Sequence, residues 1–230
     1  TEGGARVFVD PYLTGNPLCP IAAAEVTSAD LILVTHGAWD HLGDAVELAK
    51  RTGAILLSGH DVRAHAGRKG VPKEQLLGTQ PGATREVRGV RVRATEARHT
   101  SFFESEENLF LSAPPLGYVI YTQEGHRIYH AGDTCLFLDM KLIAELCRPQ
   151  VMMVPVDSVR PDTPAEMSPL DAATATRWVG PDVVVPMHYY PGSQSPEAFA
   201  KHAETLAPGT QVLLRPEGYF TYEPPRARFL

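Results

Sequence analysis

The sequence has few cysteines and no long apolar run. Its 230 residues include only Cys19, Cys135 and Cys147, an odd number without close-paired spacing. This usage argues against a disulfide framework and favours a reducing compartment, with each cysteine acting as a small buried hydrophobe. No apolar segment approaches the ~20 residues that span a bilayer, and no charged start followed by an apolar stretch opens the chain. We therefore expect a cytoplasmic protein with no membrane partner.

An excess of positive charge is also missing. The formal net charge is -6, which argues against a nucleic-acid footprint spread over the whole surface but leaves room for a local basic groove. The chain contains neither a Gly-x-Ser-x-Gly nucleophile elbow nor a Walker-type phosphate loop. We expect a small-molecule substrate as the partner, and the charge leaves a nuclease and a homo-oligomer open.

Hydrophobic residues are plentiful by comparison. They make up 43% of the chain, enough for a sizeable core, and the length fits one domain over residues 1–230, although two domains remain open.

The most informative stretch runs from Asp30 to Asp44. An apolar run at Leu31–Val34 predicts a buried strand, and the turn that follows carries His36, Asp40 and His41. Two imidazoles and a carboxylate at a strand-to-helix turn are typical of a metal site, because borderline divalent ions take nitrogen and oxygen donors. For any single histidine, capping the helix or bonding a backbone carbonyl is the simpler interpretation.

A strand, a helix and a second strand surround this turn. Residues 42–52 predict an amphipathic helix that ends at Gly53, and residues 54–57 predict the next buried strand. The order strand, helix, strand implies parallel pairing through a right-handed crossover. The architecture is therefore expected to be layered α/β, opened by a strand at residues 6–10.

Three further donors follow strands later in the chain. His99 follows a strand predicted over residues 86–96, Asp133 lies in a Gly-Asp-Thr turn after residues 127–130, and His188 follows an apolar strand that starts after Asp182. A histidine stands six residues after an aspartate at both Asp30 and Asp182, which looks like an internal duplication. Each aspartate alone could equally be a turn residue.

Other segments have weaker signals. The segment 100–116, with three phenylalanines and three glutamates, predicts a long loop that is either a lid and pocket wall or a surface loop anchored by its aromatic rings. His60 is a weak pocket candidate, and Asp157 is a weak candidate for support behind the ligands. Helices are expected over residues 139–147, from the Ser168 cap to Gly180, and from residue 195 to about 207. Strands over residues 211–215 and 219–222 are expected to close the fold.

Together these residues resemble the metallo-β-lactamase fold hydrolases, whose signature after a core strand is His-x-His-x-Asp-His. His36, Asp40 and His41 match it, whereas Ala38 stands where the family has its second histidine. The resemblance implies an αββα sandwich, and the chain looks shortened at its N-terminus compared with this family. It also implies that Asp10, after the first strand, lies behind the metal site, although a turn-capping role is open.

The same resemblance implies a ligand set and a mechanism. One metal would take His36, His99 and Asp133, and a second would take Asp40, His41, His188 and the shared Asp133. Asp40 and Asp133 are thus the expected catalytic residues, around a metal-bound hydroxide that attacks a small ester, lactone or phosphodiester. The expected cofactor is Zn²⁺, one or two ions, with Mn²⁺ or Fe as alternatives. Ala38 predicts a weakened site, with one firmly held metal and at most a weak second one.

The branch that the chain most resembles is similar to the ascorbate-6-phosphate lactonase group. This likeness rests on Gly132-Asp133-Thr134, on Pro-Met-His-Tyr at residues 186–189 and on the helix start Met167-Ser168-Pro169. Two alternatives remain: a nuclease or phosphodiesterase of the same fold, and a non-catalytic module that binds a metal or a small molecule. A structural protein with incidental histidines would need six donors to fall at four strand ends by chance.

Overall fold

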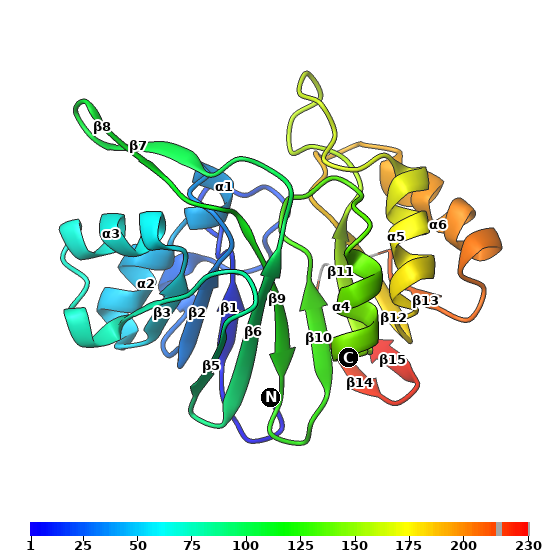
Figure 1. Ribbon diagram of the computed structural model, residues 1–230, viewed down its shortest axis with the longest axis horizontal. Helices are drawn as coiled ribbons and strands as arrows, with labels where there is room; N and C mark the ends of the chain where they lie inside the picture. Colours follow the sequence, from blue (N-terminus) through cyan, green and yellow to red (C-terminus); the bar gives the residue numbers. More distant parts are fainter. Residues whose placement is uncertain (215–217, 230) are drawn as a thin grey trace. The chain divides into compact units, whose positions relative to one another are not determined.

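The computed structural model describes residues 1–214 and 218–229. The chain divides into two compact units, coloured by sequence in Figure 1. Unit 1 comprises Thr1–Glu96 and Thr100–Gly125, and unit 2 comprises Ala97–His99 and His126–Leu230. A single domain over residues 1–230 stays a prediction.

Unit 1 contains a four-stranded parallel sheet with the order β1-β2-β3-β4. Its strands are β1 (Val7–Val9), β2 (Leu31–Val34), β3 (Ile55–Ser58) and β4 (Leu76–Gly78). Its helices are α1 (Trp39–Leu42), α2 (Ala45–Thr52) and α3 (His60–Arg68), with short 3-10 turns at Ala23–Glu25 and Lys73–Gln75. The predicted parallel pairing of the strands on either side of the helical segment is confirmed.

The core of unit 1 follows from the alternation of side chains along the strands. Ile32, Val34 and Leu56 point to one face, where the apolar sides of α2 and α3 pack on them through residues that include Leu48 and Val62. Figure 1 shows α2 and α3 beside β2 and β3. This packing fixes the end of β2, from which the His36 turn extends.

The helix predicted from Leu42 to Thr52 is interrupted, so this prediction is wrong in its first turn. α1 ends at Leu42, and α2 begins at Ala45. Gly43 between them has φ +42°, and a Cβ there would lie 2.5 Å from the carbonyl oxygen of Pro11. Only glycine tolerates both conditions, and it separates the turn that carries Asp40 and His41 from the longer helix. The predicted end at Gly53 is confirmed, with the glycine in the left-handed region.

Unit 1 also contains three strands paired in antiparallel fashion, β5 (Thr84–Val87), β6 (Val90–Glu96) and β9 (Leu116–Tyr121), in the order β5-β6-β9. The sequence predicted one strand over residues 86–96, which is wrong because Arg88 and Gly89 both take positive φ and turn the chain into a hairpin. The buried hydroxyl of Tyr118 on β9 donates to the carbonyl of Val34, 2.8 Å away. Burial raises the pKa of this phenol well above its ordinary value.

The segment 100–116, predicted to be a long loop, instead contains the hairpin of β7 (Phe102–Glu106) and β8 (Leu109–Ser112). The turn places Asn108 at φ +59°, a conformation that asparagine tolerates. The exposed rings of Phe102 and Phe110 stack with their centroids 5.4 Å apart. The aromatic residues therefore stabilise a cross-strand pair.

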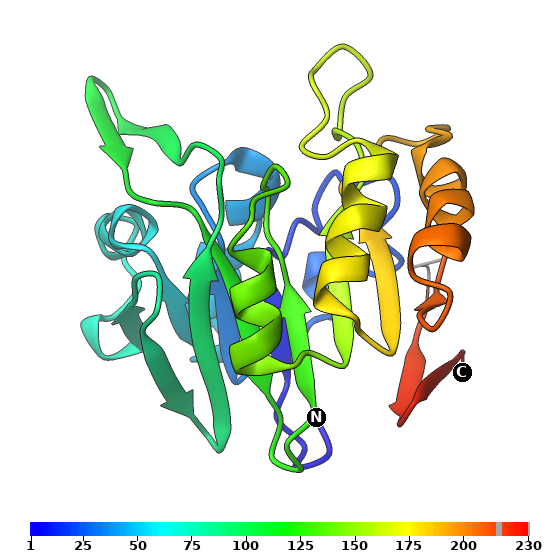
Figure 2. The ribbon, with the colours of Figure 1, turned by 45° about the vertical axis from the view of Figure 1, so that its right-hand side comes forward.

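Unit 2 contains four strands paired in parallel, in the order β10-β11-β12-β13. Its strands are β10 (Arg127–His130), β11 (Val151–Pro155), β12 (Val183–Met187) and β13 (Gln211–Val212). Its helices are α4 (Met140–Cys147), α5 (Pro169–Val179) and α6 (Ser195–Leu206), of which α5 packs against both others (Figure 2). The predicted cap of α5 is confirmed, because Ser168 Oγ accepts from the backbone of Asp171 at 3.1 Å.

The end of unit 2 differs from the prediction. β14 (Phe220–Glu223) pairs in antiparallel fashion with β15 (Arg226–Phe229), a strand that the sequence did not predict. The strand expected over residues 211–215 is found at Gln211–Val212, and Arg215 lies outside the described residues. All three cysteines are free thiols. No helix among the described residues is long and apolar enough to cross a bilayer.

Candidate metal centre

In unit 1, three predicted ligands gather at the end of β2. His36 leaves the strand directly, while Asp40 and His41 lie on the single turn of α1. Both imidazoles are buried, and their ring centroids are 4.2 Å apart. The Nε2 atom of His41 lies 3.6 Å from an Asp40 carboxylate oxygen. The structure thus brings the unit 1 donors together as the spacing predicted.

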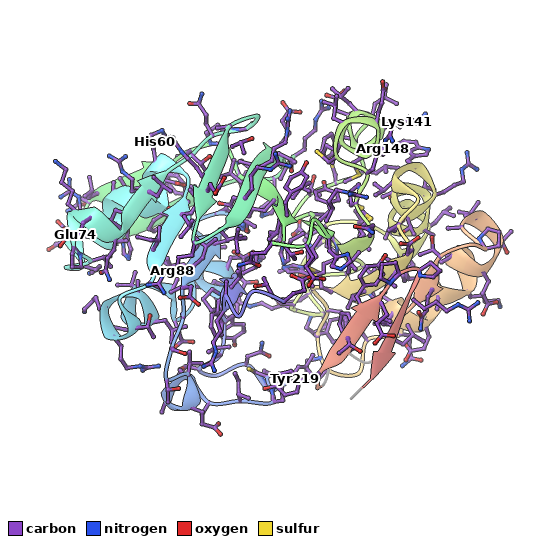
Figure 3. All side chains as sticks on the ribbon, turned by 90° about the horizontal axis from the view of Figure 1, so that it is seen from below. His60, Glu74, Arg88, Lys141, Arg148 and Tyr219 are labelled. Atoms are coloured by element: carbon purple, nitrogen blue, oxygen red, sulfur yellow. The ribbon has the colours of Figure 1, made fainter. Side chains whose placement is uncertain are left out.

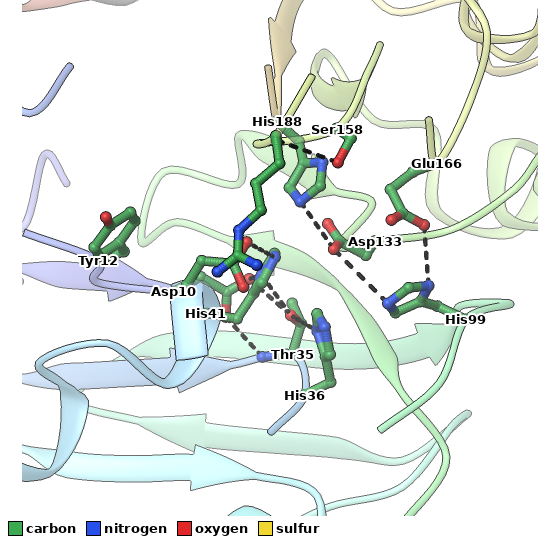
Figure 4. A network of polar contacts seen from close by, with 12 residues as sticks. Asp10, Tyr12, Thr35, His36, His41, His99, Asp133, Ser158, Glu166 and His188 are labelled. Atoms are coloured by element: carbon green, nitrogen blue, oxygen red, sulfur yellow. Dashed lines mark hydrogen bonds and ion pairs between the residues drawn. The ribbon is translucent and has the colours of Figure 1, made fainter. Parts of the chain in front are cut away.

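Asp10 and Thr35 hold these imidazoles from behind (Figure 4). Asp10 Oδ2 lies 2.8 Å from His41 Nδ1, and the two carboxylate oxygens accept from the backbone N–H and the hydroxyl of Thr35 at 2.8 and 2.7 Å. The Thr35 hydroxyl also lies 3.0 Å from His36 Nδ1. Since an ionised carboxylate only accepts, Nδ1 of His41 is the donor and Nε2 is directed toward Asp40. Of the two roles open for Asp10, the structure shows contacts that orient an imidazole.

The turn between His36 and Ala38 is fixed by the β7–β8 hairpin segment. The N–H of Gly37 donates to Ser101 Oγ at 3.0 Å, and Ser101 in turn donates to the buried carboxylate of Asp61. A Cβ at Gly37 would lie 1.9 Å from the ring of Phe103. The segment predicted as a lid or wall thus packs directly on the His36 turn, which requires glycine at residue 37.

Ala38 occupies the N-cap of α1 without a side-chain cap. A methyl group has no donor for a metal, so unit 1 offers two imidazoles and one carboxylate at this turn. Trp39, the next residue, is half exposed and meets Tyr12 edge to face, with ring centroids 5.2 Å apart.

In unit 2, the three predicted donors lie together around one carboxylate oxygen. His188 Nε2 lies 3.1 Å from Asp133 Oδ2, and His99 Nε2 lies 4.0 Å from the same oxygen (Figure 4). Asp133 is buried on the tight turn after β10, where Gly132 takes φ +65°. An aspartate that faces two imidazoles through one oxygen suits the role of a shared metal ligand.

The sequence interpretation did not include Glu166, which belongs to this cluster. Its Oε2 lies 2.9 Å from His99 Nδ1, and the ligand atoms of His99, Asp133 and Glu166 lie within 4.8 Å of one another. Glu166 sits in a polar, proline-containing segment just before the Ser168 cap of α5. The only sequence signal for Glu166 was its position directly before the start of a helix, and carboxylates are too common there to indicate a functional residue.

Asp157, a weak candidate from the sequence, supports His188. Its backbone carbonyl accepts from His188 Nδ1 at 3.1 Å, and its carboxylate accepts from the hydroxyls of Ser193 and Ser195. Burial alone would raise the pKa of Asp157. The two hydroxyls, the backbone N–H of Ser158 and the nearby His188 together outweigh this effect, so the net pKa is below the ordinary value. Asp157 therefore stays ionised and anchors the segment that holds His188.

The two histidines of α3, of which the sequence singled out His60, do not join these clusters. His60, labelled in Figure 3, is exposed at the start of α3. His65 is buried on the same helix and lies 2.7 Å from the hydroxyl of Ser105 on β7. Burial and Lys69 lower the pKa of His65, against a smaller opposite effect of Glu106. Neither residue is among the candidate metal-binding groups of the described chain.

Comparisons with known proteins give a consistent result. Residues 5–189 match the family model described as "Beta-lactamase superfamily domain". The chain is 39% identical over 218 residues to a UPF0173 metal-dependent hydrolase of Methanopyrus kandleri, covering 94% of this chain and 91% of the relative. It is 38% identical over 213 residues to a UPF0173 metal-dependent hydrolase of Rubrobacter xylanophilus, covering 90% of this chain and 84% of the relative.

A solved structure is similar over almost the whole length. It is Igni18, described as a novel metallo hydrolase from the archaeon Ignicoccus hospitalis, with a TM-score of 0.75 and 30% identity. The match covers 97% of this chain and 90% of that protein.

Proposed function

Because the chain belongs to the β-lactamase superfamily and, within it, to the UPF0173 metal-dependent hydrolases, we propose that it hydrolyses a small ester, lactone or phosphodiester with a bound divalent metal. The ligands in this proposal are His36, Asp40, His41, His99, Asp133 and His188. Zn²⁺ is the preferred ion, with Mn²⁺ or Fe as alternatives, because the donors are imidazole nitrogens and carboxylate oxygens.

The observation that carries the proposal is the way in which the imidazoles are held. His41 is engaged at Nδ1 by the Asp10 carboxylate and His188 at Nδ1 by the Asp157 carbonyl. In both, Nε2 is directed toward a carboxylate, that of Asp40 or Asp133. Metal-binding histidines characteristically donate their other ring nitrogen to a carboxylate or carbonyl. Histidines with a purely structural role would have no need for the same arrangement at both His41 and His188.

The residues of this chain have two separate roles toward such an ion, orienting the imidazoles and supplying negative charge. When bound, a divalent ion would lower the pKa of a water molecule and polarise a substrate oxygen, so that no protein nucleophile is needed. Asp10 and Asp157 hold protons at Nδ1 and fix the two ring orientations. Asp40 and Asp133 supply negative charge beside the imidazoles, which favours a cation there.

The substrate class rests on the sequence resemblance to the branch that is similar to the ascorbate-6-phosphate lactonase group. The motifs concerned are Gly132-Asp133-Thr134, residues 186–189 and the start of α5. Against the nuclease alternative stands the net charge of -6, which provides no general attraction for a polyanion.

A non-catalytic metal-binding module is the second candidate, and Ala38 is the observation that favours it. Without an imidazole at this position, we expect weaker binding at the first metal position, because loss of a ligand costs at least the ~10 to 100-fold that loss of a supporting partner costs. Restoring the histidine separates the two functions, since an enzyme gains turnover and a binding module gains only metal.

The test is the metal content of protein purified without chelator, measured by elemental mass spectrometry for the unchanged chain and for Ala38→His. We expect about one metal in the unchanged chain and about two in Ala38→His, with ester or phosphodiester turnover rising alongside. A gain of metal without turnover would support the binding module. Absence of metal from both chains would contradict the proposal and return the histidines to a structural role.

A further inference from the structure

We propose that Glu166 is a positioning residue of the metal centre, which holds His99 so that its Nε2 is presented to Asp133. This inference rests on the proposed function. All residues concerned lie in unit 2, and Glu166 belongs to the segment 157–168 between β11 and α5, here called the β11–α5 loop.

The contact between Glu166 and His99 defines which ring nitrogen is protonated. Oε2 lies 2.9 Å from Nδ1, a normal hydrogen-bond length. A carboxylate only accepts, so Nδ1 carries the proton and Nε2 carries the lone pair of the neutral ring. Glu166 is mostly buried, with 16% of its side chain exposed, so water competes weakly for this contact.

The other side of the same ring faces Asp133. His99 Nε2 lies 4.0 Å from Asp133 Oδ2, which is too far for a direct hydrogen bond. Two atoms that bind one tetrahedral ion at ~2.1 Å lie ~3.4 Å apart, so a shift of ~0.6 Å would bring both within reach of one ion. The hydrogen bond at Nδ1 therefore leaves Nε2 oriented as a ligand beside the buried carboxylate.

Glu166 is itself held in place by the segment that supports His188. The backbone N–H of Glu166 donates to the Asp157 carbonyl at 3.2 Å, and His188 Nδ1 donates to the same oxygen at 3.1 Å. Immediately after Glu166, Met167 is buried and Ser168 caps α5. Glu166 is thus fixed on both sides along the chain, as a supporting residue must be.

The two unit 2 imidazoles therefore depend on one loop. The Asp157 carbonyl orients His188 and the Glu166 carboxylate orients His99, while both Nε2 atoms face Asp133 Oδ2. In unit 1, Asp10 makes the same kind of contact with His41. Glu166 has a supporting role in this scheme, in which its Oε2 accepts from the protonated Nδ1 of His99.

The experiment compares Glu166→Ala, Glu166→Gln and the control Asp162→Asn, an exposed residue of the same loop. The first readout is the tautomer of His99 in metal-free protein, from the ¹⁵N chemical shifts of its ring nitrogens. We expect Nδ1–H in the unchanged chain and in Asp162→Asn, and a shift toward Nε2–H in Glu166→Ala. Glu166→Gln should lie between them, since its amide oxygen still accepts a hydrogen bond but has no charge.

The second readout is Zn²⁺ affinity, from competition with a chelating indicator. Glu166→Ala should bind Zn²⁺ about 10 to 100-fold more weakly, Glu166→Gln should lose less, and Asp162→Asn should bind like the unchanged chain. A Glu166→Ala protein with the original tautomer and affinity would overturn the proposal. So would an equal loss of affinity in both Glu166 variants with the tautomer unchanged, which would identify Glu166 as a direct ligand.

The two proposals fail in different ways. An unchanged chain that binds no Zn²⁺ overturns the proposed function, and the tautomer of His99 in the metal-free variants then still supports or overturns its positioning by Glu166. Zn²⁺ binding by the unchanged chain with no effect of Glu166→Ala on either readout leaves the proposed function standing and removes Glu166 from it.

Discussion

At the scale of single residues, Asp10 and Asp30 form an instructive pair. Each accepts a backbone N–H across the β1–β2 pair: Asp10 from Thr35 at 2.8 Å, and Asp30 from Arg6 at 2.8 Å. Only Asp10, at the end from which the His36 turn leaves, also contacts His41. Both aspartates therefore connect β1 and β2, but only Asp10 also holds a predicted ligand, so variants of the two can distinguish these roles.

We predict that Asp10→Asn lowers metal affinity about 10 to 100-fold, whereas Asp30→Asn does not. The amide cannot supply the charge that keeps a proton on His41 Nδ1, and its NH₂ group faces a donor in either orientation, the His41 Nδ1–H or the Thr35 N–H. Asp10→Asn should also lose more stability than Asp30→Asn, because its amide faces a donor in a mostly buried setting, whereas the hydrogen bonds of Asp30 are exposed. The measurements are Zn²⁺ competition and chemical unfolding of both proteins.

An equal loss of Zn²⁺ affinity in the two variants would contradict this prediction. It would mean that the effect reaches the ligands through the β1–β2 pair as a whole and not through the Asp10–His41 contact. Unchanged affinity in Asp10→Asn would remove the supporting role of Asp10 altogether.

At the scale of elements, the strand ends were predictable and the turns between strands were less so. The apolar run Leu31–Val34 and the Asp182–His188 repeat identify buried strands, because a parallel strand covered on both faces has no polar alternation. The β7–β8 hairpin was missed because β7 carries two glutamates, Glu104 and Glu106, and the turn contains no glycine. The break at Gly43 depends on a close approach to Pro11, a contact distant in sequence.

The contact between α3 and the β7–β8 hairpin predicts a dependence of stability on pH. Burial first, and then Lys69, lower the pKa of His65 below the ordinary 6.5, with Glu106 acting in the opposite direction. Because the folded pKa is the lower one, the unfolded chain binds the proton first as the pH falls. The contribution of His65 is therefore fully present above about pH 6.5 and is lost from there down to the folded pKa.

The measurement is the free energy of unfolding between about pH 7.5 and pH 5 for the unchanged chain, His65→Gln and His60→Gln. His60 is an exposed histidine of the same helix and serves as the matched control. We expect a smaller loss on acidification in His65→Gln than in the other two proteins. The same slope in all three would show that His65 does not lose stabilising contacts on protonation.

At the scale of the whole molecule, the family resemblance predicted more than local patterns could. The metallo-β-lactamase fold and the layered α/β class are confirmed by the family match over residues 5–189 and by the likeness to Igni18. Asp157 was only a weak candidate and Glu166 was not predicted, because their contacts with His188 and His99 join residues far apart in the sequence. The six expected ligands stay predictions that metal binding must test.

Metal binding should be visible in the stability of the entire chain. An ion that binds only the folded protein stabilises it by about 2.7 kcal/mol when its free concentration is 100 times the Kd. For a protein of this size, each kcal/mol raises the Tm by about 2–4 °C, so we expect an increase of about 5–11 °C with Zn²⁺ and its reversal by a chelator. Asp133→Asn, which replaces the carboxylate that both unit 2 imidazoles face with a neutral amide, should lose most of the increase, and Asp162→Asn should keep it. An equal increase in Asp133→Asn would place the stabilising ion at other residues.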